Sequence, residues 1–518
     1  MTTPSEAPPA PRPEPVEGRE RRLHPWSWLF VLLIQLKQFA LPLLVLLFTG
    51  RGDRNEFWPM VGVGVLALVS VAQYFTYRYR IGAEGLTIRS GLFQRTVRHI
   101  PFDRVHNVAL QQSLLHRLFG VAEVRLESAG GTRPEASMRV LSLADAQALE
   151  QRVRDHARPA ASAPDAQAPP VLALGAGELL RLGLISNRGM LVVAAVFGFA
   201  AQGDSKLFAE VVTMFGKWLL SWSEQLHLGA ASMVGGAIVL MLVALALLRL
   251  FSVAIAFLQF HGFVLHDHDG RLHMQRGLLT RLRGSLPRAR IQAFALQEGF
   301  LHRRFGRRSL AVDTMAQQND AEGKGSLRHL VPIATPETMD AIVARLLPRA
   351  SWPPSQWRPL PARTWVRLFV PGAVFWLAAA AAFAYRFGAI GWLVALGVPW
   401  AALSARRWVA NAAYAADEGL VVVREGWLDR SWRFAELGKV QGLRLARSPV
   451  DRRCGTASLL LDTAGVAPGS SGLRLRFLPL DEAQALYARL ATQIAQAPVA
   501  TGRRVIRARS VATAAPAP

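Results

Sequence analysis

The chain has 518 residues, of which 51% are hydrophobic, and its formal net charge at pH 7 is +24. A charge of this size indicates a nucleic-acid partner, an anionic lipid surface, or a membrane protein whose basic side faces the cell interior. The single cysteine, Cys454, excludes an intramolecular disulfide and fits a reducing compartment. The length accommodates three modules together with membrane helices.

Apolar stretches arranged in three pairs predict six membrane spans, because a spanning helix needs about 20 mostly apolar residues. In chain order the stretches are Leu29–Phe48, Phe57–Phe75, Gly189–Ala201, Leu228–Leu248 (which can extend to Phe260), Val366–Tyr385 and Ile390–Ser404. The third is short, with only 13 residues between Arg188 and Gln202. The first is expected to remain as an uncleaved anchor, because no small-residue cleavage site follows it closely.

The loops within the three predicted hairpins carry little charge. Residues 50–56, 202–227 and 386–388 have formal charges of 0, −1 and +1. Nearly all of the positive charge therefore lies on the other side of the membrane, and Lys and Arg near helix ends stay cytoplasmic. We expect a multi-pass protein of the cytoplasmic (inner) membrane, with both termini and all modules in the cytosol. Much of the basicity is then a topology signal, and nucleic acid is not an expected partner.

Stretches rich in Pro and Ala separate the hairpins from the modules. The expected organisation is a disordered tail (1–26), hairpins at 27–76, 187–260 and 364–405, modules at 77–156, 261–348 and 406–495, linkers at 157–186 (with a short helix) and 349–363, and a disordered tail (496–518). Apolar residues recur at helical spacing over 205–226. This segment is either a helix in the outer membrane interface or a helix packed on the protein, and the pattern favours neither.

One sequence motif occurs three times, each time after a pair of apolar stretches. The glycines that bracket it are 29 residues apart in every copy, namely Gly91 and Gly120, Gly277 and Gly306, and Gly426 and Gly455. Short β-rich runs joined by Gly turns are typical of an antiparallel meander, and each copy ends in an amphipathic helix. The pattern predicts an α+β membrane protein, in which each of three transmembrane hairpins precedes a PH-like β-barrel or sandwich capped by its C-terminal helix.

The motif in the first copy is also specific. Ile100-Pro101-Phe102-Asp103-Arg104-Val105, followed by the block 112–120 and preceded by paired membrane helices, resembles the bacterial PH-like, membrane-flanked domain family. The three copies resemble its YdbT-type members, from about Trp28 to Ile494. The third copy departs from the pattern, with Glu436, Asp451 and Cys454 at the positions of proline, histidine and phenylalanine, which puts in doubt whatever the motif binds there. The resemblance implies no enzymatic activity and a smaller single-repeat sibling as a partner.

Four arginines recur at matched positions of the first two copies: Arg104, Arg117, Arg290 and Arg303. Guanidinium groups suit phosphate, so one interpretation is contact with anionic headgroups or with a partner. The other is a structural role, either pairing with a local carboxylate such as Asp103 or capping the helical turn. Both remain open at the level of sequence.

Histidines and intramembrane charges give weaker signals. His116 and His302 share a position, and we expect them to pack rather than react because no partner residue repeats with them. The run His266-Asp267-His268-Asp269 is the most metal-like cluster, but its two histidines alternate faces on an extended chain, so we expect no metal site.

Two cations lie in or near predicted spans. Lys37 and Arg249 have no acidic partner on another span, which disfavours a proton- or ion-coupled transporter.

The expected function is therefore that of a non-enzymatic membrane scaffold or assembly subunit without cofactors. Its partners would be membrane lipids, including anionic ones, and either further copies of itself or the single-repeat sibling. The alternative is a transport or export factor that moves a lipid or hydrophobic peptide through the helical region. No convergent acid/base set indicates an enzyme.

Overall fold

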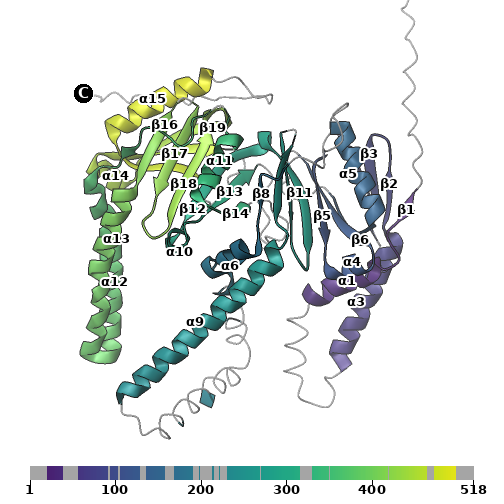
Figure 1. Ribbon diagram of the computed structural model, residues 1–518, viewed down its shortest axis with the longest axis horizontal. Coiled ribbons are helices and arrows are strands. Elements are labelled where there is room, and N and C mark those ends of the chain that lie inside the picture. Colours follow the sequence, from purple (N-terminus) through teal and green to yellow (C-terminus); the bar gives the residue numbers. More distant parts are fainter. Residues whose placement is uncertain are drawn as a thin grey trace, which may run out of the picture. The chain divides into compact units, whose positions relative to one another are not determined.

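In the computed structural model the chain divides into two compact units, Met1–Leu286 and Pro287–Pro518 (Figure 1). The boundary lies inside the second copy of the repeat, so that copy contributes strands to both units. The structure describes residues 20–38, 57–91, 94–102, 105–128, 136–157, 169–190, 198, 213–214, 221, 230–268, 270–314, 329–348, 350–417, 419–463 and 472–496.

The first unit starts with the first hairpin and the first module. The hairpin helices are α1 (Ser27–Gln38) and α3 (Phe57–Thr76), preceded by the short strand β1 (Arg21–Arg22). The module consists of β2 (Arg78–Ile81), β3 (Gly85–Ser90), β4 (Thr96–Pro101), β5 (Val105–Gln112), α4 (Leu114–Leu118), β6 (Val121–Ser128), β7 (Ala136–Ser142) and α5 (Leu143–Ala157). The remaining elements of the first unit are β8 (Leu172–Ala173), α6 (Ala176–Ile185), α9 (Ala230–Phe260), β9 (Val264–His268), β10 (Arg271–Arg276) and β11 (Arg281–Pro287).

The second unit completes the second module and adds the third hairpin and module. The second module ends with η2 (Arg288–Arg290), β12 (Ile291–Glu298), α10 (Phe300–Arg304), β13 (Arg308–Thr314), β14 (His329–Ala334) and α11 (Pro336–Leu346). The hairpin comprises β15 (Arg358–Pro359), η3 (Ala362–Thr364), α12 (Trp365–Phe387), η4 (Gly388–Leu396) and α13 (Gly397–Asn411). The third module contains β16 (Ala413–Asp417), β17 (Leu420–Glu425), β18 (Arg430–Glu436), η5 (Leu437–Lys439), β19 (Val440–Ala446), α14 (Pro449–Cys454), β20 (Thr456–Thr463), β21 (Leu473–Pro479) and α15 (Leu480–Gln496).

The first and third modules each close around one apolar core. In the first module, side chains from both strand groups and from α5 meet there, including Leu86, Leu126, Met138 and Leu149, all fully buried. In the third, α15 contributes Leu486, Leu490 and Ile494 to a core built from β17, β20 and β21, and it lies across the ends of the strands in Figure 1. Each fully buried Leu stabilises the fold by about 1.5–3 kcal/mol. A strand sandwich closed by a terminal helix is the predicted PH-like arrangement.

The segments before the hairpins return to the sheets that follow them. Each forms a two-residue strand against the first strand of the next module, with Arg21 opposite Tyr79, Leu172 opposite Leu265, and Arg358 opposite Tyr414. The described part of the N-terminal tail is therefore ordered, contrary to the prediction for residues 1–26, because β1 completes a sheet and Leu23 is buried beside it. The Pro-rich linkers likewise contain short strands, β8 (Leu172–Ala173) and β15 (Arg358–Pro359), and do not act only as spacers.

Two helical stretches among the described residues, Met241–Phe260 and Ala362–Asn411, are long and apolar enough to cross a membrane, and Val61–Thr76 is apolar but shorter. Large apolar side chains on these helices are exposed in the protein alone, for example Leu68 (72%) and Leu250 (66%), as expected for surfaces that face lipid. Figure 1 shows α12 beside α13 in the second unit. It also shows α9 of the first unit as one long helix.

The count of six spans stays a prediction. Leu29–Phe48 and Gly189–Ala201 lie largely outside the described residues, as does the helix predicted over 205–226. Where the fourth span is described, α9 runs without interruption from Ala230 to Phe260, the residue to which the sequence allowed it to extend. The sixth begins as the 3₁₀ helix η4 rather than as an α-helix.

The six repeat glycines all have a positive φ. Gly277 has a φ of +108°, and a Cβ built there would lie 1.9 Å from the carbonyl oxygen of Thr280. Gly91 and Gly426 make the same turn with the same steric conflict. A side chain at these positions would be both strained and blocked, so glycine is required to connect the second and third strands of each module.

Candidate functional site

Successive modules are joined by direct pairing of their edge strands. In the first unit β5 of the first module pairs antiparallel with β11 of the second, with Gln112 opposite Arg281 and Leu110 opposite Arg283. This pairing, here called the first junction, merges the two halves into one seven-stranded sheet in the order β7-β6-β5-β11-β10-β9-β8.

The second junction repeats this arrangement inside the second unit. There β12 pairs with β18 from Phe294 opposite Phe434 to Glu298 opposite Arg430, in a sheet of order β14-β13-β12-β18-β17-β16-β15. Arg281 and Arg430 each lie four residues after the turn glycine of their copy, and Gln112 and Glu298 each lie eight residues before the closing glycine. The two junctions therefore have the same register.

The repeated arginine of the Leu-His-Arg motif reinforces both junctions. Arg117 donates a hydrogen bond from Nη1 to the carbonyl of Leu278, 3.2 Å away. Arg303 donates from Nη1 to the carbonyl of Trp427 (2.7 Å) and from Nη2 to that of Leu428 (3.1 Å). All three acceptors lie in the turn that begins at the glycine of the following module. We call these two residues the clasp arginines, because each one holds the turn of the next module.

The clasp differs from both roles considered for these residues in the sequence. Within the described part of the chain, both arginines donate to backbone carbonyls 161, 124 and 125 residues away, and neither pairs with a local carboxylate or caps its own helix. Arg104 lies outside the described residues. Arg290 is partly buried in η2, where its carbonyl accepts a hydrogen bond from Gln292. Headgroup binding by the four arginines stays a prediction.

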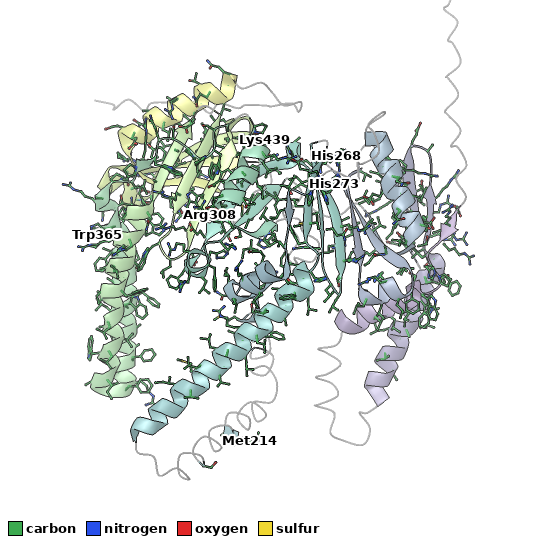
Figure 2. The ribbon with its side chains drawn as sticks, viewed as in Figure 1. Met214, His268, His273, Arg308, Trp365 and Lys439 are labelled. Atoms are coloured by element: carbon green, nitrogen blue, oxygen red, sulfur yellow. The ribbon has the colours of Figure 1, made fainter. Side chains whose placement is uncertain are left out.

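Aromatic and ionic contacts add to the second junction. The rings of Phe294 and Phe434 stack with centroids 5.2 Å apart, and Trp352 covers Phe434 at 4.5 Å. The guanidinium of Arg308 lies 5.2 Å from the ring centroid of Trp432, and Lys439 donates to the carbonyl of Ala289; Figure 2 labels both cations. The second junction is accordingly packed like the interior of a protein.

His302 lies next to the second junction. A Cβ on the neighbouring Gly299 would approach Asp429 Oδ1 to 2.7 Å and the His302 ring to 3.3 Å, so glycine permits the turn to come close. Burial lowers the pKa of His302, and the nearby Asp429 only partly offsets this. The neutral imidazole is thus favoured.

The first module is attached to its hairpin through His116. Phe30 of α1 is 4% exposed, and its ring centroid lies 4.3 Å from that of His116 and 6.0 Å from that of Phe119. Ser113 Oγ is 2.6 Å from Nδ1 of His116 and fixes the ring. The packing role expected for this histidine thus fits the structure, with helix α1 as its partner.

The third module uses an ion pair at the same place in the repeat. Asp451, which replaces the histidine, accepts a 2.6 Å hydrogen bond from Arg367 near the start of α12. Ser448 and Thr456 also donate to its carboxylate. Burial alone would raise the pKa of Asp451, but these hydrogen bonds hold it well below its usual range. The substitution therefore changes the chemistry of the contact without removing it.

The guanidinium of Arg367 is further supported by Phe477. It lies 4.6 Å from the centroid of that ring, and Phe477 has a φ of +62°, an uncommon conformation for an aromatic residue. Non-glycine residues are held in this region only when their surroundings fix them. The strained residue thus contributes to the attachment of the third module to its hairpin.

A basic pocket that sequence reasoning missed lies in the third module. It is open, holds about 100 Å³, and is lined by Val423, Glu425, Ser431, Arg433, Gly472, Arg474 and Arg476. Burial raises the pKa of Glu425, while the three arginines act in the opposite direction. Three guanidiniums around one carboxylate leave a net positive site suited to an anion such as phosphate. The alternation Arg474-Leu475-Arg476 on one strand was the available signal.

The remaining sequence candidates have structural partners or no convergent ligands. Arg249 donates to the carbonyls of Leu184 and Ser186 and to Asn187 Oδ1, so it ties α9 to the end of α6. His268 and His273 lie on the neighbouring strands β9 and β10 (Figure 2). The described part of the chain contains no group of three or more His, Cys, Asp or Glu side chains placed to hold a metal ion.

Comparison with known proteins agrees with this architecture. A family model described as "Bacterial PH domain" matches residues 31–157, 223–347 and 369–494. The chain belongs to the bacterial PH domain family. The matches end at residues 157, 347 and 494, within or directly after the closing helix of each module, which confirms the resemblance found in the sequence.

One curated relative carries the same combination. The bacterial PH domain chain is 24% identical over 336 residues to the "UPF0699 transmembrane protein YdbT" of Bacillus subtilis (strain 168). The match covers 60% of the chain and 66% of the relative, slightly under two thirds of its length. No solved structure matches the chain significantly. The chain is thus a transmembrane protein with repeated bacterial PH domains.

Proposed function

We propose that this protein is a non-enzymatic scaffold of the cytoplasmic membrane, whose cytosolic PH modules bind a protein partner and an anionic lipid headgroup. The observation that carries the proposal is the pair of junctions with one register. The same two strand edges join successive modules at both junctions, so these edges are suited to docking one module against another. The membrane hairpins would hold such an assembly at the lipid surface.

The lipid part of the proposal rests on the basic pocket rather than on the clasp arginines. Arg117 and Arg303 already donate to carbonyl groups, whereas Arg474 is exposed at the rim of the pocket. Anionic lipids attract basic residues near the surface by about 1 kcal/mol each. A headgroup phosphate therefore suits this pocket better than the motif positions.

Native mass spectrometry of the full chain, extracted from its own membranes in mild detergent, tests the scaffold. We expect the chain to appear with another protein subunit in a fixed ratio, together with bound phosphatidylglycerol. A chain that is found alone after mild cross-linking in intact membranes would contradict the scaffold.

The same measurement tests the pocket through matched variants. R474A/R476A should lose bound phosphatidylglycerol, whereas R304A/R453A, which removes two exposed arginines outside the pocket, should retain it. Equal losses in both variants would assign lipid binding to overall charge instead.

A further inference from the structure

The last module retains an open copy of the edge that forms both junctions. The strand that receives the following module is β5 in the first copy and β12 in the second, and its equivalent in the third is β19. Among the described residues β19 pairs with β20 alone, so its other edge has no strand beside it. Unpaired edges offer a row of free N–H and C=O groups to another chain.

The clasp is present at this end as well. Arg452 lies three residues before Gly455, as Arg117 and Arg303 lie three residues before Gly120 and Gly306. Its side chain is exposed. The edge strand and the arginine that together hold the next module in both junctions are therefore both available at the end of the third module.

The charge of this edge differs from that of the junction strands, because β5 has the neutral Ala109 and Gln112 at the two positions where β19 and its end have arginines. β19 carries Arg444 and is followed by Arg447, and both are exposed. At the equivalent positions β12 has Ala295 and Glu298, which face Arg433 and Arg430. An edge that accepts arginines within the chain has thus been replaced by one that repels them, because like charges opposite each other destabilise a strand pair.

This charge disfavours a second copy of the chain as the occupant. Among the described strands, the equivalent of β11 and β18 in the first module is β4, which lies at the edge of its sheet without a module beside it. In the register of the junctions, β4 would place Arg95 opposite Arg447 and Arg98 opposite Arg444. In both of these pairs an arginine would lie opposite an arginine.

From this pattern we infer that the β19 edge with Arg452 docks the edge strand and turn of a module on another protein, one with acidic residues opposite Arg444 and Arg447. The inference deepens the proposed scaffold function and rests on it. The turn of the partner would supply carbonyl groups to Arg452, and its strand would extend the sheet of β19, β20 and β21. The charge pattern thereby selects a foreign module over a further copy.

The test uses the full chain in nanodiscs and two labelled peptides. One peptide has the native sequence of residues 426–436, which contains the turn and strand that dock in the second junction; the other carries R430E and R433E. We expect fluorescence anisotropy at low salt to show roughly tenfold tighter binding of the acidic peptide. R444E/R447E in the full chain should reverse this order.

The clasp is tested by R452A, which should weaken binding of the acidic peptide several-fold. R453A, at the adjacent exposed arginine, is the matched control. Full-length R444E/R447E should also self-associate in a concentration-dependent way, since Arg95 and Arg98 would then face glutamates.

Equal binding of both peptides, or an order that R444E/R447E leaves unchanged, would overturn the inference. So would wild-type self-association that R444E/R447E abolishes, because this would assign the edge to a second copy. If no peptide binds while native mass spectrometry still shows a stoichiometric partner, the scaffold stands and only the assignment of this edge falls.

Discussion

The first module is held to helix α1 by an aromatic contact, whereas the third is held to α12 by a buried ion pair. Phe30 meets His116 in one, and Arg367 meets Asp451 in the other. The histidine and the aspartate occupy the same place in the repeat. The repeat therefore preserves the position of the attachment while its chemistry changes.

The junctions differ between the two units in a similar way. The first has three residue pairs and one hydrogen bond from its clasp arginine. The second has five pairs, the stacked rings of Phe294 and Phe434, and two hydrogen bonds from Arg303. The register is the same, so the junctions differ in the number of paired residues and in their side chains, and substitutions can measure the contribution of the side chains.

Asp451→Ala is expected to have the largest effect. It leaves the buried Arg367 without its charged partner and removes the N3 side chain of the capping box of α14, so we expect a loss of about 4–6 kcal/mol from the second unit. Denaturant unfolding in detergent, followed by tryptophan fluorescence, measures it. His116→Ala in the first module should cost only about 1 kcal/mol beyond its buried area.

The double variant R367F/D451H sharpens this comparison, since it installs the aromatic pair of the first module in the third. It should recover at least half of the loss. A double variant as unstable as Asp451→Ala would show that the two attachments are not interchangeable.

Phe434→Ala tests the packing that only the second junction has. The side chain is fully buried against Phe294 and Trp352, so its removal should cost about 3–5 kcal/mol. Faster hydrogen exchange in β12 and β18 would localise the loss. Ser285→Ala, at the equivalent place in the first junction, should cost less than about 1.5 kcal/mol.

The clasp arginines should differ by their number of hydrogen bonds. Arg303→Ala leaves two carbonyls without their donor and should cost about 1–3 kcal/mol. Arg117→Ala removes one exposed bond and should stay within about 0.5 kcal/mol. Equal losses in the two variants, from hydrogen exchange of the turns after Gly277 and Gly426, would contradict this ranking.

The smallest effect is a pH dependence confined to the second unit. The folded pKa of His302 is lowered, so the unfolded chain binds more protons near neutral pH. The contribution of His302 is therefore fully present above about pH 6.5 and is lost as the pH falls through the folded pKa. His302→Gln should flatten the pH profile of unfolding of the second unit and leave that of the first unchanged.

Much of the module could be predicted because its determinants are local. Gly91, Gly277 and Gly426 mark turns that only glycine can make, and the apolar spacing of the final helices indicates which face is buried. The junctions could not be predicted, since strand pairing uses backbone groups that every residue has. The carbonyl partners of Arg117 and Arg303 leave no trace in the sequence for the same reason.

The basic pocket was missed for a different reason. Arg474 and Arg476 read as an ordinary solvent face of a strand, and Arg433 lies 41 residues earlier in the chain. Only the packing of β21 against β17 and β18 brings the three together around Glu425. The departure at Asp451 looked like decay of the motif because its partner, Arg367, lies in a membrane helix outside the repeated motif.

A shared register makes the repeats modular in a combinatorial sense. If the middle copy were excised, β5 would meet β18 with Gln112 opposite Arg430 and Leu110 opposite Trp432, and no two charges of one sign would collide. The backbone pairing is thus interchangeable between the two junctions, and the side chains on the paired strands distinguish one junction from the other.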